Sequence, residues 1–269
     1  MNPAVTVRAA ELLALSRGNS VRPLRFPPAL SPQSLEEGYA IQIAAARLRN
    51  SPLAGYKIGL TSTESQRSMG AAEPIAGRLA VVDLHRSPAR IHLGSQHLRI
   101  VEAEVVFEIG RSLLPGQAPF TGIAVADAVR SVFAGIEICD SRFSSRDDLP
   151  LAHLVADNSN ADLLVVGEPL TDWREPEFAN LPIKLTRQDR PVVSGSPGRV
   201  LGHPLSALTW LANWLAARGE GLIAGQLIAS GTCTGMAETA FADIVVATFG
   251  THAKVAVELV CQNVSEVEL

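Results

Sequence analysis

The distribution of hydrophobic and polar residues along the chain changes near residue 50. Before this point, apolar residues recur at helical spacing over residues 4–16, and again from the Ser31-Pro32 pair to residue 49. Serine followed by proline is typical of a helix start, because serine can cap the first turn and proline fits its first position. The pattern therefore predicts a helical N-terminal section over residues 1–50.

Beyond residue 50, short apolar runs separated by turn residues predict β-strands. These runs cover residues 55–60, 78–84, 89–93, 99–109, 135–140, 161–167, 181–186, 191–194, 221–229, 244–249 and 253–260. Helical spacing returns over residues 121–133 and 203–218, where Gly219 favours a helix end. Because strands and helices do not alternate regularly, we expect an α+β fold with a curled, largely antiparallel sheet, formed by residues 51–269 as one β-rich domain.

Composition and charge narrow the possible partners. With 47% hydrophobic residues among 269, the chain can bury one large core. The net charge is −4 and the sequence has no basic cluster, which argues against a nucleic-acid partner. No apolar run reaches the roughly 18 residues that a membrane helix requires, so we expect no membrane partner. The cysteines are far apart and lack a CxxC pair, which predicts no disulfide framework and favours a reducing cytoplasm.

The strongest chemical feature is the segment VEAEVVF at 101–107. In a strand, residues two apart share one face, so Glu102 and Glu104 would lie side by side. Glu137 stands in another short apolar run, between Ile136 and Ile138. Three carboxylates in apolar strands, without a matching set of His or Cys, suit a hard divalent cation such as Mg²⁺. The same alternation also fits strand faces that are exposed to solvent.

Two further segments could contribute chemistry. Lys57 lies in the glycine-bounded segment GYKIGLT at 55–61, in a chain whose other lysines are Lys184 and Lys254. A desolvated lysine can lose its proton whereas arginine effectively cannot, so Lys57 is a candidate acid–base residue, with an exposed strand lysine as the alternative. The turn GTCTG at 231–235 offers hydroxyls and backbone amides that could hold a carboxylate or an enolate, or it forms an ordinary loop.

Taken in order, these segments resemble a known family. The matching text is GYKIGLT at 55–61, EP at 73–74, GRL at 77–79, EAE at 102–104, IEI at 136–138, DSR at 140–142, VADNS at 155–159, LGHPL at 201–205, WLA at 210–212, GTCTG at 231–235 and FG at 249–250. The ordered set resembles the 2-keto-4-pentenoate hydratases and 4-oxalocrotonate decarboxylases of the fumarylacetoacetate hydrolase superfamily. The resemblance covers nearly the whole chain from residue 31 onward.

The resemblance implies an α+β fold with a rolled mixed β core, and it makes residues 51–269 the catalytic domain. It also implies one Mg²⁺ or Mn²⁺ ion as cofactor. The site residues that it implies are, for the metal, Glu102, Glu104 and Glu137; for catalysis, Lys57; and for substrate binding, Ser159, Thr232 and Arg142.

The implied activity is that of a metal-dependent lyase on a small 2-oxo or 2-hydroxydienoic acid from aromatic ring cleavage. Hydration of a 2-hydroxypentadienoate-type acid is the first expectation. Decarboxylation of a 4-oxalocrotonate-type acid is the alternative, and C–C bond hydrolysis is a third, although we identify no His/Glu pair that would activate water. Because relatives assemble and the apolar fraction is high, we also expect a homo-oligomer.

One position departs from the family pattern. Hydratases of this branch typically carry Pro-Asp-Phe-Gly where this sequence has Pro74-Ile75-Ala76-Gly77. Isoleucine cannot transfer a proton, so the step assigned to that aspartate would fall to Lys57, to a bound water or to another carboxylate. Ile75 also leaves open a non-catalytic protein that binds a 2-oxo acid or supports a catalytic partner.

Overall fold

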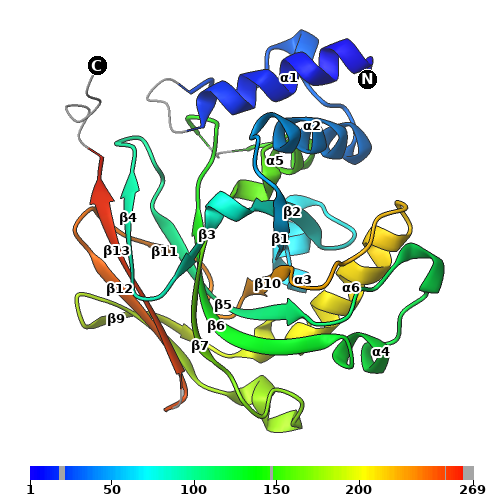
Figure 1. Cartoon of the computed structure of the whole chain (residues 1–269). Helices are drawn as coiled ribbons and strands as arrows, with labels where there is room; N and C mark the ends of the chain where they lie inside the picture. The colour runs from blue at the N-terminus through cyan, green and yellow to red at the C-terminus, as the bar shows by residue number, and fades with distance from the viewer. Residues whose placement is uncertain (18–21, 146–147, 252, 263–269) are drawn as a thin grey trace.

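The computed structural model describes residues 1–17, 22–145, 148–251 and 253–262 (Figure 1). Its α-helices are α1 (Pro3–Ser16), α2 (Leu35–Leu48), α3 (Thr63–Met69), α4 (Gly122–Ala126), α5 (Leu151–Ala156) and α6 (Pro204–Ala216). Its strands are β1 (Leu53–Gly59), β2 (Ile75–Ala80), β3 (Leu84–Arg86), β4 (Ala89–Leu93), β5 (Ile100–Ile109), β6 (Val129–Cys139), β7 (Ala161–Pro169), β8 (Ile183–Arg187), β9 (Arg190–Gly195), β10 (Leu227–Thr232), β11 (Ala237–Glu238), β12 (Ile244–Phe249) and β13 (Ala253–Cys261).

Two sheets form the framework of the described part of the chain. The larger has the order β2-β1-β10-β5-β6-β7-β3, with β11 paired to β5, and the smaller has the order β4-β13-β12-β8-β9. The long strands β5 and β6 pair antiparallel, whereas β1 pairs β10 and β3 pairs β7 in parallel. The larger sheet curls until β2 contacts β7 (Figure 1). The predicted α+β fold with a rolled mixed β core is confirmed.

The curl divides the hydrophobic core in two. A small buried cluster that includes Leu79, Val106, Leu164 and Ala229 lies on the concave face of the large sheet. A larger cluster fills the space between the other face, the second sheet and the helices. Helix α6 packs against β10, while α1 packs on α2 and α2 on α5 (Figure 1). Among the described residues, none of the helices combines the length and apolarity that a bilayer crossing requires.

Several predicted boundaries are wrong. The helical spacing over residues 121–133 yields only α4, because Val129 already begins β6 and its register places Val132 opposite Phe107 of β5. Strand pairing thus outweighs local spacing. The second helix begins at Leu35 rather than at Ser31, since the Ser34 hydroxyl caps its first turn. The strands predicted over 78–84 and 221–229 also shift, because β2 ends and β10 begins within these ranges.

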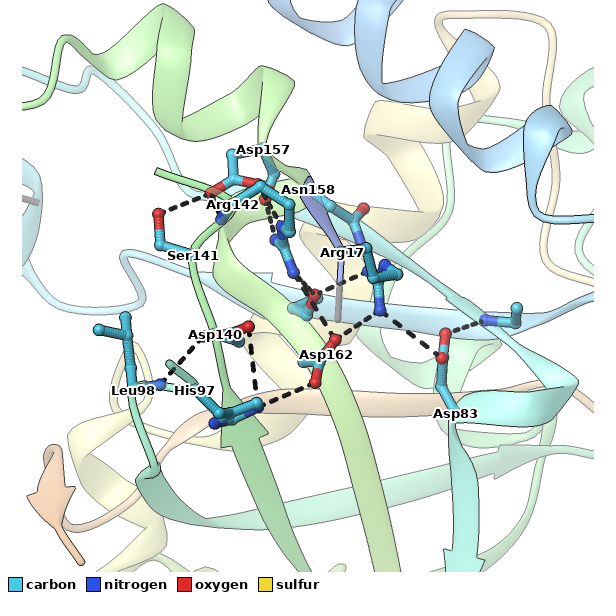
Figure 2. A network of polar contacts seen from close by, with 12 residues as sticks. Arg17, Asp83, His97, Leu98, Asp140, Ser141, Arg142, Asp157, Asn158 and Asp162 are labelled. Carbon is cyan, nitrogen blue, oxygen red and sulfur yellow. Dashed lines mark hydrogen bonds and ion pairs between the residues drawn. The ribbon is translucent and has the colours of Figure 1, made fainter. Parts of the chain in front are cut away.

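A buried polar network joins the first helices to the large sheet (Figure 2). Arg17, which follows α1, pairs with Asp162 on β7. Arg49, at the end of α2, pairs with Asp83 between β2 and β3. These ion pairs fix both helices against the sheet. The division of the chain into two domains near residue 50 stays a prediction.

Candidate active site

Four ionisable side chains meet on the concave face of the large sheet. Glu102 and Glu104 lie on β5, and the register places Glu137 of β6 directly opposite Glu102. Lys57, on β1, reaches the same place, where its Nζ lies 3.4 Å from Glu137 Oε1. The structure therefore brings together the four residues that the sequence indicates for metal binding and catalysis.

Three of these side chains are almost entirely removed from solvent, and Glu102 is partly exposed. Glu104 and Glu137 are 0% exposed and Lys57 is 5% exposed. The Gly231 N–H donates to Glu104 Oε2 at 2.9 Å, and Lys57 Nζ donates to the Ser159 carbonyl at 2.9 Å. Glu104 Oε1 and both Glu137 oxygens accept no hydrogen bond from the described residues. Because buried polar atoms are ordinarily hydrogen-bonded, these oxygens mark the place of a further partner.

The turn at Gly231 determines which oxygen of Glu104 is left without a hydrogen-bond donor. Gly231 has φ of 109°, a backbone conformation that favours glycine. A Cβ at this position would also overlap the Thr61 side chain. Glycine thus lets the turn approach closely enough for its N–H to reach Glu104 Oε2, which leaves Oε1 facing the cluster without a donor.

Burial and like charge leave this cluster electrostatically unbalanced. Burial raises the pKa of Glu104 well above its ordinary value, and Glu137 and Glu102 raise it further. Burial also raises the pKa of Glu137, although Lys57 opposes this shift. For Lys57, burial lowers the pKa, but the carboxylates outweigh burial and the pKa lies above its ordinary value. Ionised together, the three carboxylates would outweigh the one ammonium, and a divalent cation would balance the excess negative charge.

One further member of the cluster, Cys139, is not among the residues that the sequence motifs indicate. It follows Glu137 by two residues on β6 and therefore shares its face of the sheet. Its sulfur lies 3.8 Å from Glu102 Oε2, and ligand atoms of Glu102, Glu137 and Cys139 all lie within 4.8 Å of one another. Burial raises the pKa of the Cys139 thiol well above its ordinary value, which disfavours Cys139 as a ligand because the thiolate is the form that binds a metal. The spacing of two from Glu137 is the signal that could have identified this residue.

In a second group of possible metal ligands, the negative charges are already balanced by arginine side chains. Atoms of His97, Asp140 and Asp162 also lie within 4.8 Å of one another. The Arg99 backbone N–H donates to His97 Nδ1 at 2.9 Å, which assigns the ring proton to Nε2, 3.0 Å from Asp162. Asp140 accepts two hydrogen bonds from Arg22. Arg17 pairs with Asp162 (Figure 2). These residues form an ion-pair network rather than a cation site.

Two of the three residues predicted to bind substrate lie beside the cluster. Ser159 reaches it through its backbone carbonyl, while its hydroxyl donates to the Ala76 carbonyl at 3.0 Å. Thr232 lies opposite Glu104 in the β10–β5 register, and its hydroxyl accepts the Gly235 N–H at 2.9 Å. The Ser159 hydroxyl is therefore occupied within the fold, whereas Thr232 stands next to a predicted metal ligand.

Arg142, the third, is engaged elsewhere. Its side chain is 3% exposed and forms an ion pair with Asp157. Its terminal nitrogens donate to the carbonyls of Asp157 at 2.5 Å and Ala161 at 3.1 Å (Figure 2). All three guanidinium nitrogens thus donate within this network, and the structure does not bring Arg142 to the glutamates. A substrate contact would require a buried ion pair to break.

Ile75 lies at the edge of the cluster. It is opposite Gly59 of β1 in the β1–β2 register and is 3% exposed. A Cβ built on Gly59 would lie 3.2 Å from Ile75 Cγ1 and 3.6 Å from Lys57 Nζ. The isoleucine and the ammonium therefore flank the same glycine, and an apolar side chain stands where the hydratase pattern has a carboxylate.

A cavity of about 730 Å³ lies away from this cluster, between α2 and the β1–β2 pair. Its lining includes Gln42, Arg49 and Leu79, but none of the four clustered side chains. The candidate site is therefore located by the convergence of ionisable groups and not by the size of a cavity.

Comparison with known proteins places these observations in context. The chain is 34% identical over 238 residues to a 2-keto-4-pentenoate hydratase of Paraburkholderia xenovorans (strain LB400). This match covers 86% of each chain. It is 31% identical over 220 residues to a 4-oxalocrotonate decarboxylase of Pseudomonas sp, covering 81% of this chain and 82% of the relative. No family model matches.

Solved structures show the same fold. The 4-oxalocrotonate decarboxylase from Pseudomonas putida G7, complexed with magnesium and adipate, superposes with a TM-score of 0.86. The match covers 97% of this chain and 99% of that chain at 24% sequence identity. The agreement extends over nearly the whole chain, including the helical section before residue 50.

Replacing Arg142 tests whether this residue stabilises the fold. Replacing one partner of a buried ion pair leaves the other uncompensated, so Arg142→Met should lower the free energy of unfolding by about 3–5 kcal/mol. Urea denaturation measures this loss. The matched control is Arg130→Met, which removes a surface ion pair with Glu108 (3.0 Å) and should cost less than about 1 kcal/mol. Equal, small losses in both variants would contradict the structural role of Arg142.

Proposed function

Because the chain belongs to the family of 2-keto-4-pentenoate hydratases and 4-oxalocrotonate decarboxylases, we propose that it is a metal-dependent lyase for a small 2-oxo or 2-hydroxydienoic acid. The first choice is hydration of a 2-hydroxypentadienoate-type acid in the breakdown of aromatic compounds. The observation that carries this proposal is the convergence of Lys57 with Glu102, Glu104 and Glu137 on one buried face.

The three glutamates fit a hard divalent ion. Glu104 Oε1 and both Glu137 oxygens are buried without a hydrogen-bond donor among the described residues. Carboxylate oxygens are the donors that Mg²⁺ and Mn²⁺ prefer. We propose that Glu102, Glu104 and Glu137 hold this ion. When bound, it supplies a Lewis acid that polarises a 2-oxo group and stabilises its enolate.

Lys57 is the proposed proton carrier. Its ammonium group donates one hydrogen bond to the Ser159 carbonyl and forms an ion pair with Glu137 at 3.4 Å, which holds it at the glutamates. Its other N–H groups are available to a substrate. Its charge would offset negative charge that develops on the substrate. Thr232, opposite Glu104, is the favoured substrate contact of the 231–235 turn. The apolar cluster around these groups excludes water from the reacting atoms.

Ile75 favours decarboxylation of a 4-oxalocrotonate-type acid as the second candidate. A hydratase must move a proton from water, and the aspartate that the family pattern offers for this step is replaced here by an apolar side chain beside Lys57. Loss of CO₂ needs a stabilised enolate and one proton, and it does not need that carboxylate. The same replacement supports a third possibility, a protein that binds the acid without turning it over.

We also propose that the chain forms a homo-oligomer in the cytoplasm. The described cysteines are free, which agrees with a reducing compartment. Leu53, Val81 and Val82 are exposed to 39%, 52% and 61%, and the backbone hydrogen bond from Val81 to Pro52 holds them close together. Exposed apolar side chains that are held close together suit a subunit contact.

Replacing Glu104 tests the proposed metal site. A carboxyl group whose pKa is raised in the folded state loses stability as the pH rises above its ordinary value, since ionisation costs more in the fold. Metal-free Glu104→Gln should therefore unfold at a higher temperature than metal-free wild type at neutral pH. Mg²⁺ at a hundred times its Kd should stabilise wild type by about 2.7 kcal/mol and the variant by much less.

Thermal unfolding with and without Mg²⁺ measures both effects, and calorimetry with Mn²⁺ measures binding directly. The matched control is Glu108→Gln on the same strand, whose carboxylate pairs with the exposed Arg130. A metal-dependent shift of equal size in Glu104→Gln and Glu108→Gln would remove Glu104 from the metal site.

Replacing Lys57 tests its proposed role as the proton carrier. Loss of a general acid–base group typically costs about 10²–10⁴-fold in rate, so Lys57→Ala should lose at least this much kcat while metal binding persists. Lys57→Arg should also fail, because arginine does not release its proton near neutral pH and has a larger, planar head group. Steady-state kinetics measures the loss, with exposed Lys254→Ala as the control. Near-normal kcat with an altered KM in Lys57→Arg would instead assign Lys57 to binding a substrate carboxylate.

Substrate assays of the parent chain and of Ile75 variants decide between hydration and decarboxylation. A small panel of dienoates and oxalocrotonates is assayed by UV absorbance with added Mg²⁺. If the site is of the hydratase kind, Ile75→Asp should raise the hydration rate, whereas Ile75→Asn, of nearly the same shape but unable to transfer the proton, should not. Decarboxylase activity in the parent chain without any gain in Ile75→Asp would favour the second candidate. A parent chain that binds Mg²⁺ but converts neither substrate would support the non-catalytic alternative.

A further inference from the structure

Three consecutive residues before β7 have a left-handed backbone. Asn158, Ser159 and Asn160 have φ of 56°, 56° and 59°, and none of them is glycine. Residues with a Cβ rarely adopt this conformation, and when they do it is normally at a single position. Such a segment persists only where its surroundings hold it, and it is typical of functional sites.

Side chains of the segment bind it to the backbone of β2. Asn158 Oδ1 accepts the Arg78 N–H at 2.7 Å, and Asn158 Nδ2 donates to the Arg78 carbonyl at 2.8 Å. The Ser159 hydroxyl donates to the Ala76 carbonyl at 3.0 Å. A Cβ built on the intervening Gly77 would lie 2.5 Å from Asn158 O, so glycine is required for this approach.

The residue before the segment is held by the buried ion-pair network. Asp157 is 1% exposed and pairs with Arg142. The Ser141 hydroxyl donates to Asp157 Oδ2 at 2.9 Å, and Arg142 donates to the Asp157 carbonyl at 2.5 Å (Figure 2). The left-handed segment is therefore fixed between β2 and the buried ion-pair network, which leaves its backbone little freedom to shift.

This fixed segment presents one group to the active site, the Ser159 carbonyl. It accepts a hydrogen bond from Lys57 Nζ at 2.9 Å, while Glu137 lies 3.4 Å from the same nitrogen. A carbonyl accepts from an ammonium group without competing for its proton, so it sets direction and leaves the charge unchanged. The side chain of Lys57 itself passes Gly77, whose built Cβ would lie 3.0 Å from Lys57 Cγ.

We propose that Asn158 and Ser159 are positioning residues for Lys57, acting through the left-handed segment and the Ser159 carbonyl. The proposal rests on the proposed function, in which Lys57 carries the proton. Asn158 sets the distance of the segment from β2, and the Ser159 hydroxyl secures it at Ala76. The substrate contact expected for Ser159 from the family resemblance is replaced by this backbone role.

The experiment compares Asn158→Ala, Asn158→Gly and Ser159→Ala in the full chain with Mg²⁺. Misplacement of a reacting group by about 1 Å can cost about 10²-fold in rate, so all three variants should lose about this much kcat with little change in KM. Asn158→Gly is the informative partner of Asn158→Ala, because glycine accepts the left-handed backbone while removing both hydrogen bonds to Arg78. Asn158→Gly should therefore unfold at a higher temperature than Asn158→Ala, but its kcat should be reduced as much.

Asn50→Ala is the matched control. Asn50 has a left-handed φ of 50°, close to the 56° of Asn158, but it is exposed just after α2. Its replacement should lower the unfolding temperature slightly and leave kcat unchanged. This control separates the strain of alanine in a left-handed position from the loss of positioning.

A second readout does not depend on turnover. Labelling of Lys57 by an amine-reactive ester, followed by mass spectrometry, is compared with labelling of the exposed Lys184 and Lys254 in the same molecules. The relative rate at Lys57 should rise in all three variants and not in Asn50→Ala. Calorimetry with Mn²⁺ alone verifies that each variant retains its metal site and is folded.

Two results would overturn the proposal. The first is wild-type kcat and unchanged Lys57 labelling in Asn158→Gly, which would reduce the segment to backbone strain alone. The second is a rise in KM at constant kcat in Ser159→Ala, which would return the Ser159 hydroxyl to substrate binding. If the wild type turns over no substrate, the proposed function fails, whereas labelling still decides whether Asn158 and Ser159 hold Lys57 in place.

Discussion

One ammonium group faces three carboxylates on the concave face of the large sheet, and the other features of the site depend on this imbalance. Glu102 and Glu137 lie directly opposite each other on neighbouring strands, an arrangement that is destabilising for like charges. Lys57 offsets only part of the charge, and Glu104 Oε1 and both Glu137 oxygens still have no donor among the described residues. Folding alone gives no reason to bury these groups, so a bound cation explains them better than stability does.

The neighbouring polar network serves as an internal comparison. It too is buried and acidic, but Arg17 and His97 supply hydrogen bonds to Asp162 (Figure 2). Arg22 supplies two more to Asp140. Its charges are therefore balanced by the chain itself, and it connects the helical section to the sheet. Distance between possible ligands cannot separate the two groups, because ligand atoms of Glu102, Glu137 and Cys139 lie within 4.8 Å of one another, as do those of His97, Asp140 and Asp162. The hydrogen bonds already made by each oxygen separate them.

The sequence predicts the parts of this site that depend on local periodicity. Spacing of two along a strand placed Glu102 and Glu104 on one face, and the apolar run around Glu137 identified its strand. The extent of β6 was not predictable in this way, because its first half is decided by pairing with β5. Nor was the acceptor of Lys57, since it is a backbone carbonyl 102 positions away whose place depends on three left-handed residues.

The family motifs divide into those that supply chemical groups and those that hold them in place. The segments at 55–61, 102–104 and 136–138 carry Lys57 and the glutamates. The segments at 77–79, 140–142 and 155–159 instead meet one another: Arg142 pairs with Asp157, and Asn158 binds the backbone of Arg78. Resemblance in a motif therefore does not distinguish a residue that touches substrate from one that supports it. For Arg142 and Ser159, the geometry favours support.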